Sequence, residues 1–135
     1  RITRYRLDDN LVIKGYLPEH SDVLMEMKKS RVFVLPSYFD TGPRCIAESM
    51  ALKVPVAAYK IKGVAWMLGE NQERGITVPA GNIEQLCEAA ERLLENRDQT
   101  PAMTENAYAF AVRHFQASAV VDGLFSIYQQ ILTNK

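Results

Sequence analysis

One short stretch, residues 37–48, holds the side chains best suited to ligand chemistry. It contains the carboxylates of Asp40 and Glu48, the guanidinium of Arg44, and Gly42 between them. Carboxylate oxygens readily accept from the two hydroxyls of a vicinal diol, and a guanidinium forms forked hydrogen bonds with phosphate. Glycine lets a backbone approach a ligand closely. The stretch therefore predicts a site for a phosphorylated, hydroxyl-rich ligand.

Each of these side chains also has an ordinary structural interpretation. Glu48 could be a solvated helix carboxylate, and Asp40 could cap a loop or a helix, as aspartate often does. Arg44 could form a surface salt bridge that contributes little to stability. The sequence alone leaves both interpretations open.

Other reactive residue types give weaker signals. Lys60 and Lys62 are predicted to be solvated, Trp66 to serve packing rather than base stacking, and Cys45 to be a small buried apolar side chain. The two histidines, His20 and His114, share no motif with a nucleophile, and we expect them to be structural or exposed. No glycine-rich GxGxxG or GxxxxGK[ST] phosphate fingerprint occurs.

Strand and helix patterns alternate along the first two thirds of the chain. Short apolar runs end at glycine or proline, and helical spacing follows them. The predicted strands are residues 11–14, 31–35, 54–59 and 75–78. Nearly continuous apolar strands that alternate with helices are typical of a parallel sheet covered on both faces.

The last third is predicted to be helical. Asn82 and Gln85 resemble a capping box, and Thr100 followed by Pro101 is typical of a helix start. A final helix carries apolar residues from Val120 onward. The fold class expected is α/β, a Rossmann-like parallel sheet flanked by helices, with about four strands and a helical C-terminal third.

In such sheets ligands bind beyond the carboxyl ends of the strands. The loops at residues 15–17, 37–42 and 60–63 are therefore the candidates. The loop at 37–42 leads into a predicted helix, with Pro43 near its start. The free N–H groups and positive dipole at a helix N-terminus favour phosphate there.

Composition narrows the function classes. The 135 residues carry 16 Lys and Arg against 16 Asp and Glu, a formal net charge of zero, which argues against a nucleic-acid partner. No apolar run is long enough to span a membrane. Cys45 and Cys87 have no metal-ligand spacing and fit a reducing compartment. We expect a single domain over residues 1–135, and the initial Arg1 suggests a piece of a longer protein.

Five segments, in order, resemble one enzyme family. The run DTGPRCIAESMALKVPVAA resembles the E-x7-E region of the retaining, GT-B-fold "glycosyl transferases group 1" family. The segments NLVIKGYLP, RVFVLPS, IKGVAWMLGENQERGITVPAGNIEQLCEAAERLL and HFQASAVVDGLFSIYQQIL resemble its flanking segments. Three departures are an aspartate at the first acidic position, Thr41 for the usual glycine, and Ala65-Trp66 for a common Pro-Glu.

The resemblance implies a role for each matching position. Asp40 would contact hydroxyls of the transferred sugar, and Glu48 would accept from the ribose hydroxyls of a UDP- or GDP-type sugar donor. The backbone at Thr41, Gly42, Pro43 and Arg44 would approach the sugar and diphosphate. The backbone at Gly15, Tyr16 and Leu17 would meet the base. No metal or other cofactor is expected.

The resemblance also implies what the chain lacks. The acceptor-binding domain, the first strands of the donor domain and the basic residues that clamp the diphosphate would precede Arg1. The chain would then be half of a GT-B C-terminal domain, inactive alone, in a cytoplasmic, hexosyltransferase-type enzyme of polysaccharide biosynthesis that acts near the membrane. A sugar, glycan or lipid-linked acceptor would bind elsewhere. The alternative is a non-catalytic assembly or regulatory module with a decayed donor site.

The missing strands would leave the edge of strand 31–35 open. We expect the exposed edge to be paired in one of two ways: the strand at 11–14 pairs with it, or a second chain does so and forms a homodimer.

Overall fold

The structure is a computed structural model that describes residue 7, residues 9–96 and residues 98–133. Its centre is a parallel sheet of β1 (Phe33–Leu35), β2 (Val56–Tyr59) and β3 (Ile76–Val78), in the order β1-β2-β3. Phe33 pairs with Val56, and Ala57 pairs with Ile76. The expected α/β class and parallel sheet are confirmed.

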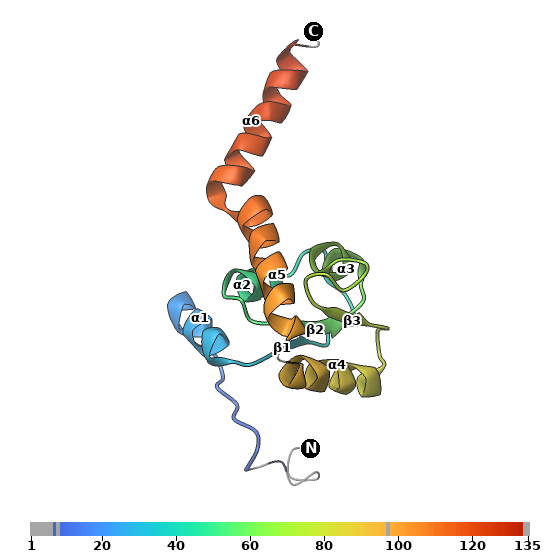
Figure 1. The fold of residues 1–135 in the computed structure, drawn as a ribbon. Coiled ribbons are helices and arrows are strands. Elements are labelled where there is room, and N and C mark those ends of the chain that lie inside the picture. The colour runs from blue at the N-terminus through green and yellow to red at the C-terminus, as the bar shows by residue number, and fades with distance from the viewer. Residues whose placement is uncertain (1–6, 8, 97, 134–135) are drawn as a thin grey trace.

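Helices cover both faces of this sheet (Figure 1). The helix α4 (Ile83–Glu95) lies on one face, and α2 (Arg44–Ala51), α3 (Lys62–Leu68) and α5 (Gln99–Phe115) lie on the other. All residues of β2 are buried, and alternate side chains enter opposite cores: Val56 and Ala58 face α2, while Ala57 and Tyr59 face α4. This alternation explains why the middle strand is apolar throughout.

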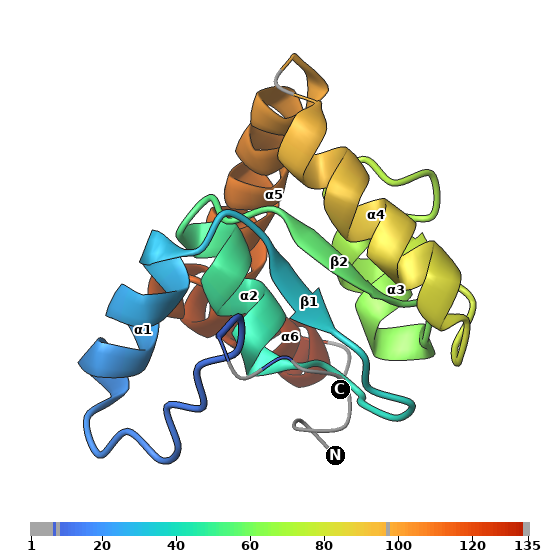
Figure 2. The same cartoon turned by 90° about the horizontal axis from the view of Figure 1, so that it is seen from below.

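Two further helices lie at the ends of the described chain. The helix α1 (His20–Lys29) packs beside α2, as Figure 2 shows, and the buried Ser49 Oγ donates to Met27 Sδ at 3.2 Å between them. The helix α6 (Ala117–Thr133) extends away from the sheet, and none of its residues is buried (Figure 1).

The helix caps follow the sequence signals in part. Asn82 caps α4, because its side chain accepts from the backbone N–H of Gln85 at 3.0 Å, as the capping pattern predicted. The helix α5 begins at Gln99, slightly before the predicted Thr100–Pro101 start. The helix α3 was not predicted. Its buried Val64, Met67 and Leu68 pack under the sheet and hold it there.

The strand predicted at residues 11–14 is wrong. These residues form no strand, and the side chains of Val12 and Ile13 are 77% and 73% exposed. A strand needs a partner for its backbone N–H and C=O groups, and within the described residues the sheet pairs β1 only with β2. The expectation that residues 11–14 pair with the edge of β1 is therefore also wrong. Pairing with a second chain remains a prediction.

Candidate functional site

The loop between β1 and α2 brings Asp40 to the carboxyl end of the sheet. The backbone N–H of Gly42 donates to Asp40 Oδ1 at 3.0 Å, which closes a tight turn before the helix. Pro43 is the N-cap residue of α2 and has no side-chain cap hydrogen bond. The N–H groups of the first turn of a helix lack intrahelical partners, so an uncapped start can receive an anion.

A pocket of about 720 Å³ lies where this loop meets the start of α3. Its size is within the range of small-molecule sites. The pocket combines aromatic rings with the carboxylate of Asp40 and the amine of Lys62. It is lined by Tyr38, Phe39, Asp40, Thr41, Ile61, Lys62, Gly63 and Trp66.

Gly63 allows the two walls of the pocket to touch. A Cβ at this position would lie 2.5 Å from the carbonyl carbon and oxygen of Thr41 and 2.9 Å from the nitrogen of Gly42. Real Cβ atoms do not approach backbone so closely. Only glycine therefore lets α3 begin directly against the loop that carries Asp40.

Trp66 is held by an aromatic cluster as well as lining the pocket. Its ring lies 5.2 Å from that of Phe110 and 6.0 Å from that of Phe115, both in edge-on contact. Arg74 donates to the backbone oxygens of Met67 at 2.7 Å and Trp66 at 3.1 Å, and its guanidinium lies over Phe110. The predicted packing role of Trp66 fits these contacts.

Glu48 lies on α2, outside the lining of that pocket. Its Oε1 is 3.2 Å from His20 Nε2 and 3.4 Å from Arg44 Nη2. The Glu48 side chain is only 21% exposed, whereas that of Arg44 is 83% exposed. The structure therefore joins Glu48 to Arg44, as their spacing on one helix suggests, and to His20 from α1.

The two acidic residues share a neighbour. Burial raises the pKa of the Cys45 thiol, and the negative charges of Asp40 and Glu48 raise it further. A raised pKa suppresses the thiolate, which is the nucleophilic form. This environment fits the prediction that Cys45 is not a nucleophile, but its side chain is half-buried rather than buried.

Gly15, Tyr16 and Leu17 precede α1 by two residues and do not line the pocket. Gly15 has a φ of 67°, a left-handed conformation that glycine adopts without steric cost. The Tyr16 side chain is 89% exposed, and that of Leu17 is half-buried. Lys14 Nζ lies 3.3 Å from Glu26 Oε2 on α1, so the segment is tied back to the helix that it precedes.

The predicted residues thus fall into three neighbouring groups. Asp40 and Thr41 line the pocket, and residues 15–17 precede α1. Arg44 and Glu48 lie on α2, where Glu48 also contacts His20 of α1. Gly42 and Pro43 join the pocket loop to α2 and do not line the pocket. Sequence analysis missed the contributions of His20 and Gly63. Gly63 belongs to residues 60–63, which the sequence predicted as a loop, but it lies in the first turn of α3, and only its close approach to Thr41 reveals its role.

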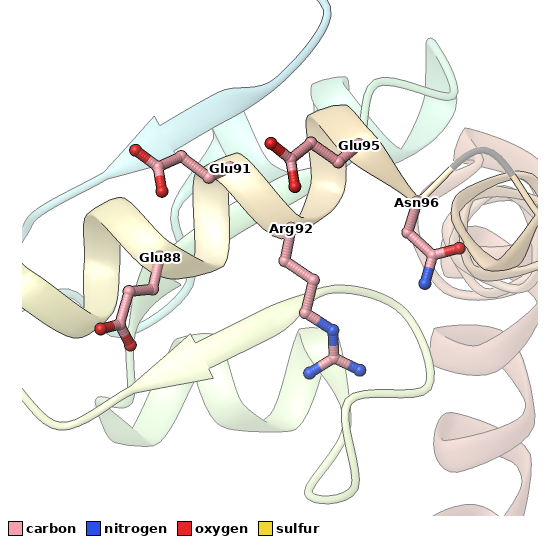
Figure 3. Close-up of a pocket in the computed structure, with 5 residues that line it drawn as sticks. All are labelled: Glu88, Glu91, Arg92, Glu95 and Asn96. Atoms are coloured by element: carbon pink, nitrogen blue, oxygen red, sulfur yellow. The ribbon is translucent and has the colours of Figure 1, made fainter.

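A second hollow, on α4, does not form a convergent site. It is lined by Glu88, Glu91, Arg92, Glu95 and Asn96, all from one helix and its end. In Figure 3 these side chains spread to different sides of the helix instead of pointing toward one centre. We therefore place the candidate site at the carboxyl ends of β1 and β2, where the pocket beside Asp40 lies.

Among the described residues, none of the helices has both the length and the apolar character needed to cross a bilayer.

Comparison with known proteins identifies one family. Residues 1–110 match the model of the family described as "Glycosyl transferases group 1". The chain is 30% identical over 125 residues to an alpha-D-kanosaminyltransferase of Streptomyces kanamyceticus, covering 93% of this chain and 32% of the relative. It is 27% identical over 120 residues to the putative teichuronic acid biosynthesis glycosyltransferase TuaC of Bacillus subtilis, covering 89% and 30%.

A solved structure has the same fold. Sucrose-phosphate synthase from Thermosynechococcus elongatus superimposes with a TM-score of 0.85 at 22% identity, over 99% of this chain and 33% of that one. At this identity the likeness supports the fold alone. The chain spans about a third of the length of the relatives it matches.

Proposed function

The chain belongs to the group 1 glycosyltransferases, and on that premise we propose that it is the donor-binding portion of an enzyme that transfers a sugar from a nucleotide-diphosphate donor with retention of configuration. The observation that carries the proposal is the pocket beside the uncapped N-terminus of α2, with Asp40 in its wall. It lies at the carboxyl end of a parallel sheet, where ligands of this fold class bind.

The transferred sugar occupies the pocket in this proposal. Asp40 accepts from its hydroxyls through the carboxylate oxygen that does not hold the backbone N–H of Gly42. Tyr38, Phe39 and Trp66 supply apolar faces around it. Such faces suit the C–H surfaces of a sugar ring, while the carboxylate fixes its orientation.

The diphosphate lies against the backbone from Thr41 to Arg44. N–H groups at the start of α2 point at the phosphate oxygens, and Lys62 from the pocket wall adds a positive charge. When the bond to the sugar breaks, the leaving diphosphate gains negative charge. Donors fixed in advance stabilise that charge without having to reorganise. The reaction as proposed needs no metal, and full activity in the presence of EDTA would support this.

The nucleoside lies toward α1. Glu48 accepts from the ribose hydroxyls, and the backbone of residues 15–17 meets the base. The partial burial of Glu48 strengthens its hydrogen bonds relative to those of a solvated carboxylate. The acceptor, a sugar or glycan, binds outside this chain. The putative teichuronic acid biosynthesis glycosyltransferase favours polysaccharide assembly as the setting. So does a lipopolysaccharide core biosynthesis mannosyltransferase of Rhizobium meliloti, to which the chain is 21% identical over 133 residues.

The test is Glu48→Ala in the full-length protein. We expect donor affinity or transfer to fall at least about tenfold, because a lost acceptor for a multidentate partner costs about 1.5–3 kcal/mol. Calorimetric titration with UDP, GDP and their sugars measures affinity, and product formation measures transfer. Glu105→Ala is the matched control, since it removes a helix carboxylate that pairs with Lys53 far from the site.

The outcomes separate enzyme from module. A folded Glu48→Ala protein with unchanged affinity and rate would overturn the ribose assignment. Saturable donor binding without transfer to any sugar acceptor would favour the non-catalytic module instead.

A further inference from the structure

His20 is the first residue of α1, and it reaches across to α2. Its Nε2 lies 3.2 Å from Glu48 Oε1. Arg44 Nη2 lies 3.4 Å from the same oxygen. Within the described residues, the other carboxylate oxygen, Oε2, takes part in no hydrogen bond or ion pair.

Two polar contacts to one oxygen, the hydrogen bond from Arg44 and the close approach of the His20 imidazole, restrain the orientation of the carboxylate. Rotation about the last side-chain bond would exchange Oε1 and Oε2, and it would break both contacts. The free oxygen is thereby presented in a constant direction. A ligand hydroxyl that donates to it meets a preorganised acceptor and loses less entropy on binding.

The histidine contact also ties two elements together. His20 follows the segment of residues 15–17 closely, and that segment is anchored on its other side by the pair between Lys14 and Glu26. The His20–Glu48 contact therefore links this segment to the carboxylate on α2. A second link, from Ser49 to Met27, is buried farther along the same helix pair.

From this geometry we infer that His20 is a positioning residue for donor recognition: it holds Glu48 Oε1 so that Oε2 receives a ribose hydroxyl of the nucleotide. The inference rests on the proposed function, because it assigns the ribose to Glu48. His20 itself touches no part of the donor in this scheme. It acts through Glu48, and it sets the distance between the base-binding segment and the ribose-binding carboxylate.

His20 contributes more to this positioning than Arg44 does. Arg44 stands on the same helix as Glu48, its side chain is 83% exposed, and an exposed pair within one helix is weak. A long, solvated arginine also loses more rotamer entropy when it is held in place. His20 comes from a different helix and has a shorter side chain.

The experiment compares ordinary and deoxygenated nucleotides on the full-length protein. We expect His20→Ala to weaken binding of UDP or GDP, whichever the protein binds, about three- to tenfold, the range for loss of one polar partner of a carboxylate. The same variant should bind the 2′,3′-dideoxy form of that nucleotide as the parent does. His20→Gln keeps an N–H donor of similar reach and should recover most of the affinity.

A double substitution separates positioning from a direct contact. In a Glu48→Ala background, His20→Ala should cause no further loss, because the group that it orients is gone. Lys53→Gln is the matched control: it breaks another exposed ion pair, between the turn after α2 and Glu105 of α5, and should leave nucleotide affinity unchanged. Circular dichroism confirms that each variant is folded.

Two results would overturn the inference and leave the proposed function standing. One is a loss from Glu48→Ala with none from His20→Ala. The other is a His20→Ala loss that persists with the dideoxy nucleotide or in the Glu48→Ala background. If Glu48→Ala itself has no effect, the ribose assignment fails, and the role of His20 fails with it.

Discussion

Asp40 combines the two roles that the sequence left open. One carboxylate oxygen accepts from the backbone N–H of Gly42 and shapes the turn, while the side chain also lines the pocket. Structural and functional interpretations therefore do not exclude each other at this residue. A substitution that keeps the turn but removes the charge can separate them.

Asp40→Asn is that substitution. Asparagine keeps an Oδ1 acceptor for Gly42, so the turn and the melting temperature should be retained. The neutral amide is a weaker acceptor than a carboxylate for sugar hydroxyls, and transfer in the full-length protein should fall at least about tenfold. Steady-state kinetics with the donor varied measures this loss. Full activity in the asparagine variant would show that no anion is needed at this position.

Asp40→Glu tests the shorter side chain that distinguishes this sequence from the family pattern. Glutamate retains the charge and reaches about 1.5 Å farther. We expect activity to be kept or raised, with a slightly less stable loop because the turn contact to Gly42 is lost. A kcat/KM for Asp40→Glu well below that for Asp40→Asn would show that a negative charge at this position is not what the reaction requires.

At this scale the sequence predicts residues that act within one element better than residues that meet across elements. Arg44 and Glu48 stand one helical turn apart, so their contact follows from helix geometry. His20 and Glu48 meet only because α1 packs beside α2. No local pattern encodes that contact, which explains why the sequence predicted only a structural or exposed His20.

At the scale of elements, the short helix α3 decides the shape of the pocket. Its residues carry no clear helix signal, because Gly63 and the β-branched Val64 are poor helix formers. Burial of Val64, Met67 and Leu68 overrides that local preference. The strands predicted at 31–35, 54–59 and 75–78 are confirmed apart from their first residues. The apolar runs of β2 and β3 match burial on two faces, whereas β1 is only partly buried.

The run at residues 11–14 shows the limit of that signal. Its residues are as apolar as a strand, but in this chain no neighbouring strand pairs with them within the described residues. An apolar run predicts a strand only where a partner edge exists, and the sequence does not reveal which edges are present.

Gly63→Ala tests the contact between α3 and the loop of Asp40. The new Cβ would lie 2.5 Å from Thr41 backbone, so the loop or the helix must shift. Such overpacking typically costs about 1–3 kcal/mol. We expect a lower melting temperature of the full-length protein and weaker donor binding. Gly123→Ala, with nothing within 4 Å of its Cβ, is the control and should leave both unchanged or slightly raise stability. Unaltered donor affinity in Gly63→Ala would show that this contact does not shape the site.

At the scale of the whole molecule, the chain has a larger accessible surface than a compact monomer of the same mass. It has 9915 Å² of accessible surface, whereas a compact monomer of 15.3 kDa would have about 7,100 Å². The excess fits an extended segment before α1 and the projecting helix α6 (Figure 1). Large apolar side chains along α6 are exposed: Val120, Val121, Leu124, Phe125, Ile127, Tyr128, Ile131 and Leu132.

Two surfaces are therefore candidates for any self-association of the 135-residue chain: the apolar residues of α6, and the edge of β1, with which no strand among the described residues pairs on that side. We expect α6 to dominate, because contiguous apolar area drives association in water, and β1 offers an edge of only three residues.

Light scattering after size-exclusion chromatography should show oligomers of the 135-residue chain that dissociate on dilution. Leu124→Lys with Tyr128→Lys should yield monomers, with helix content kept by circular dichroism. Val34→Lys, at the β1 edge, should leave the oligomers intact. Monomers from Val34→Lys alone would instead favour the sheet-edge dimer that the sequence suggested, because a lysine there blocks pairing of strands without touching α6.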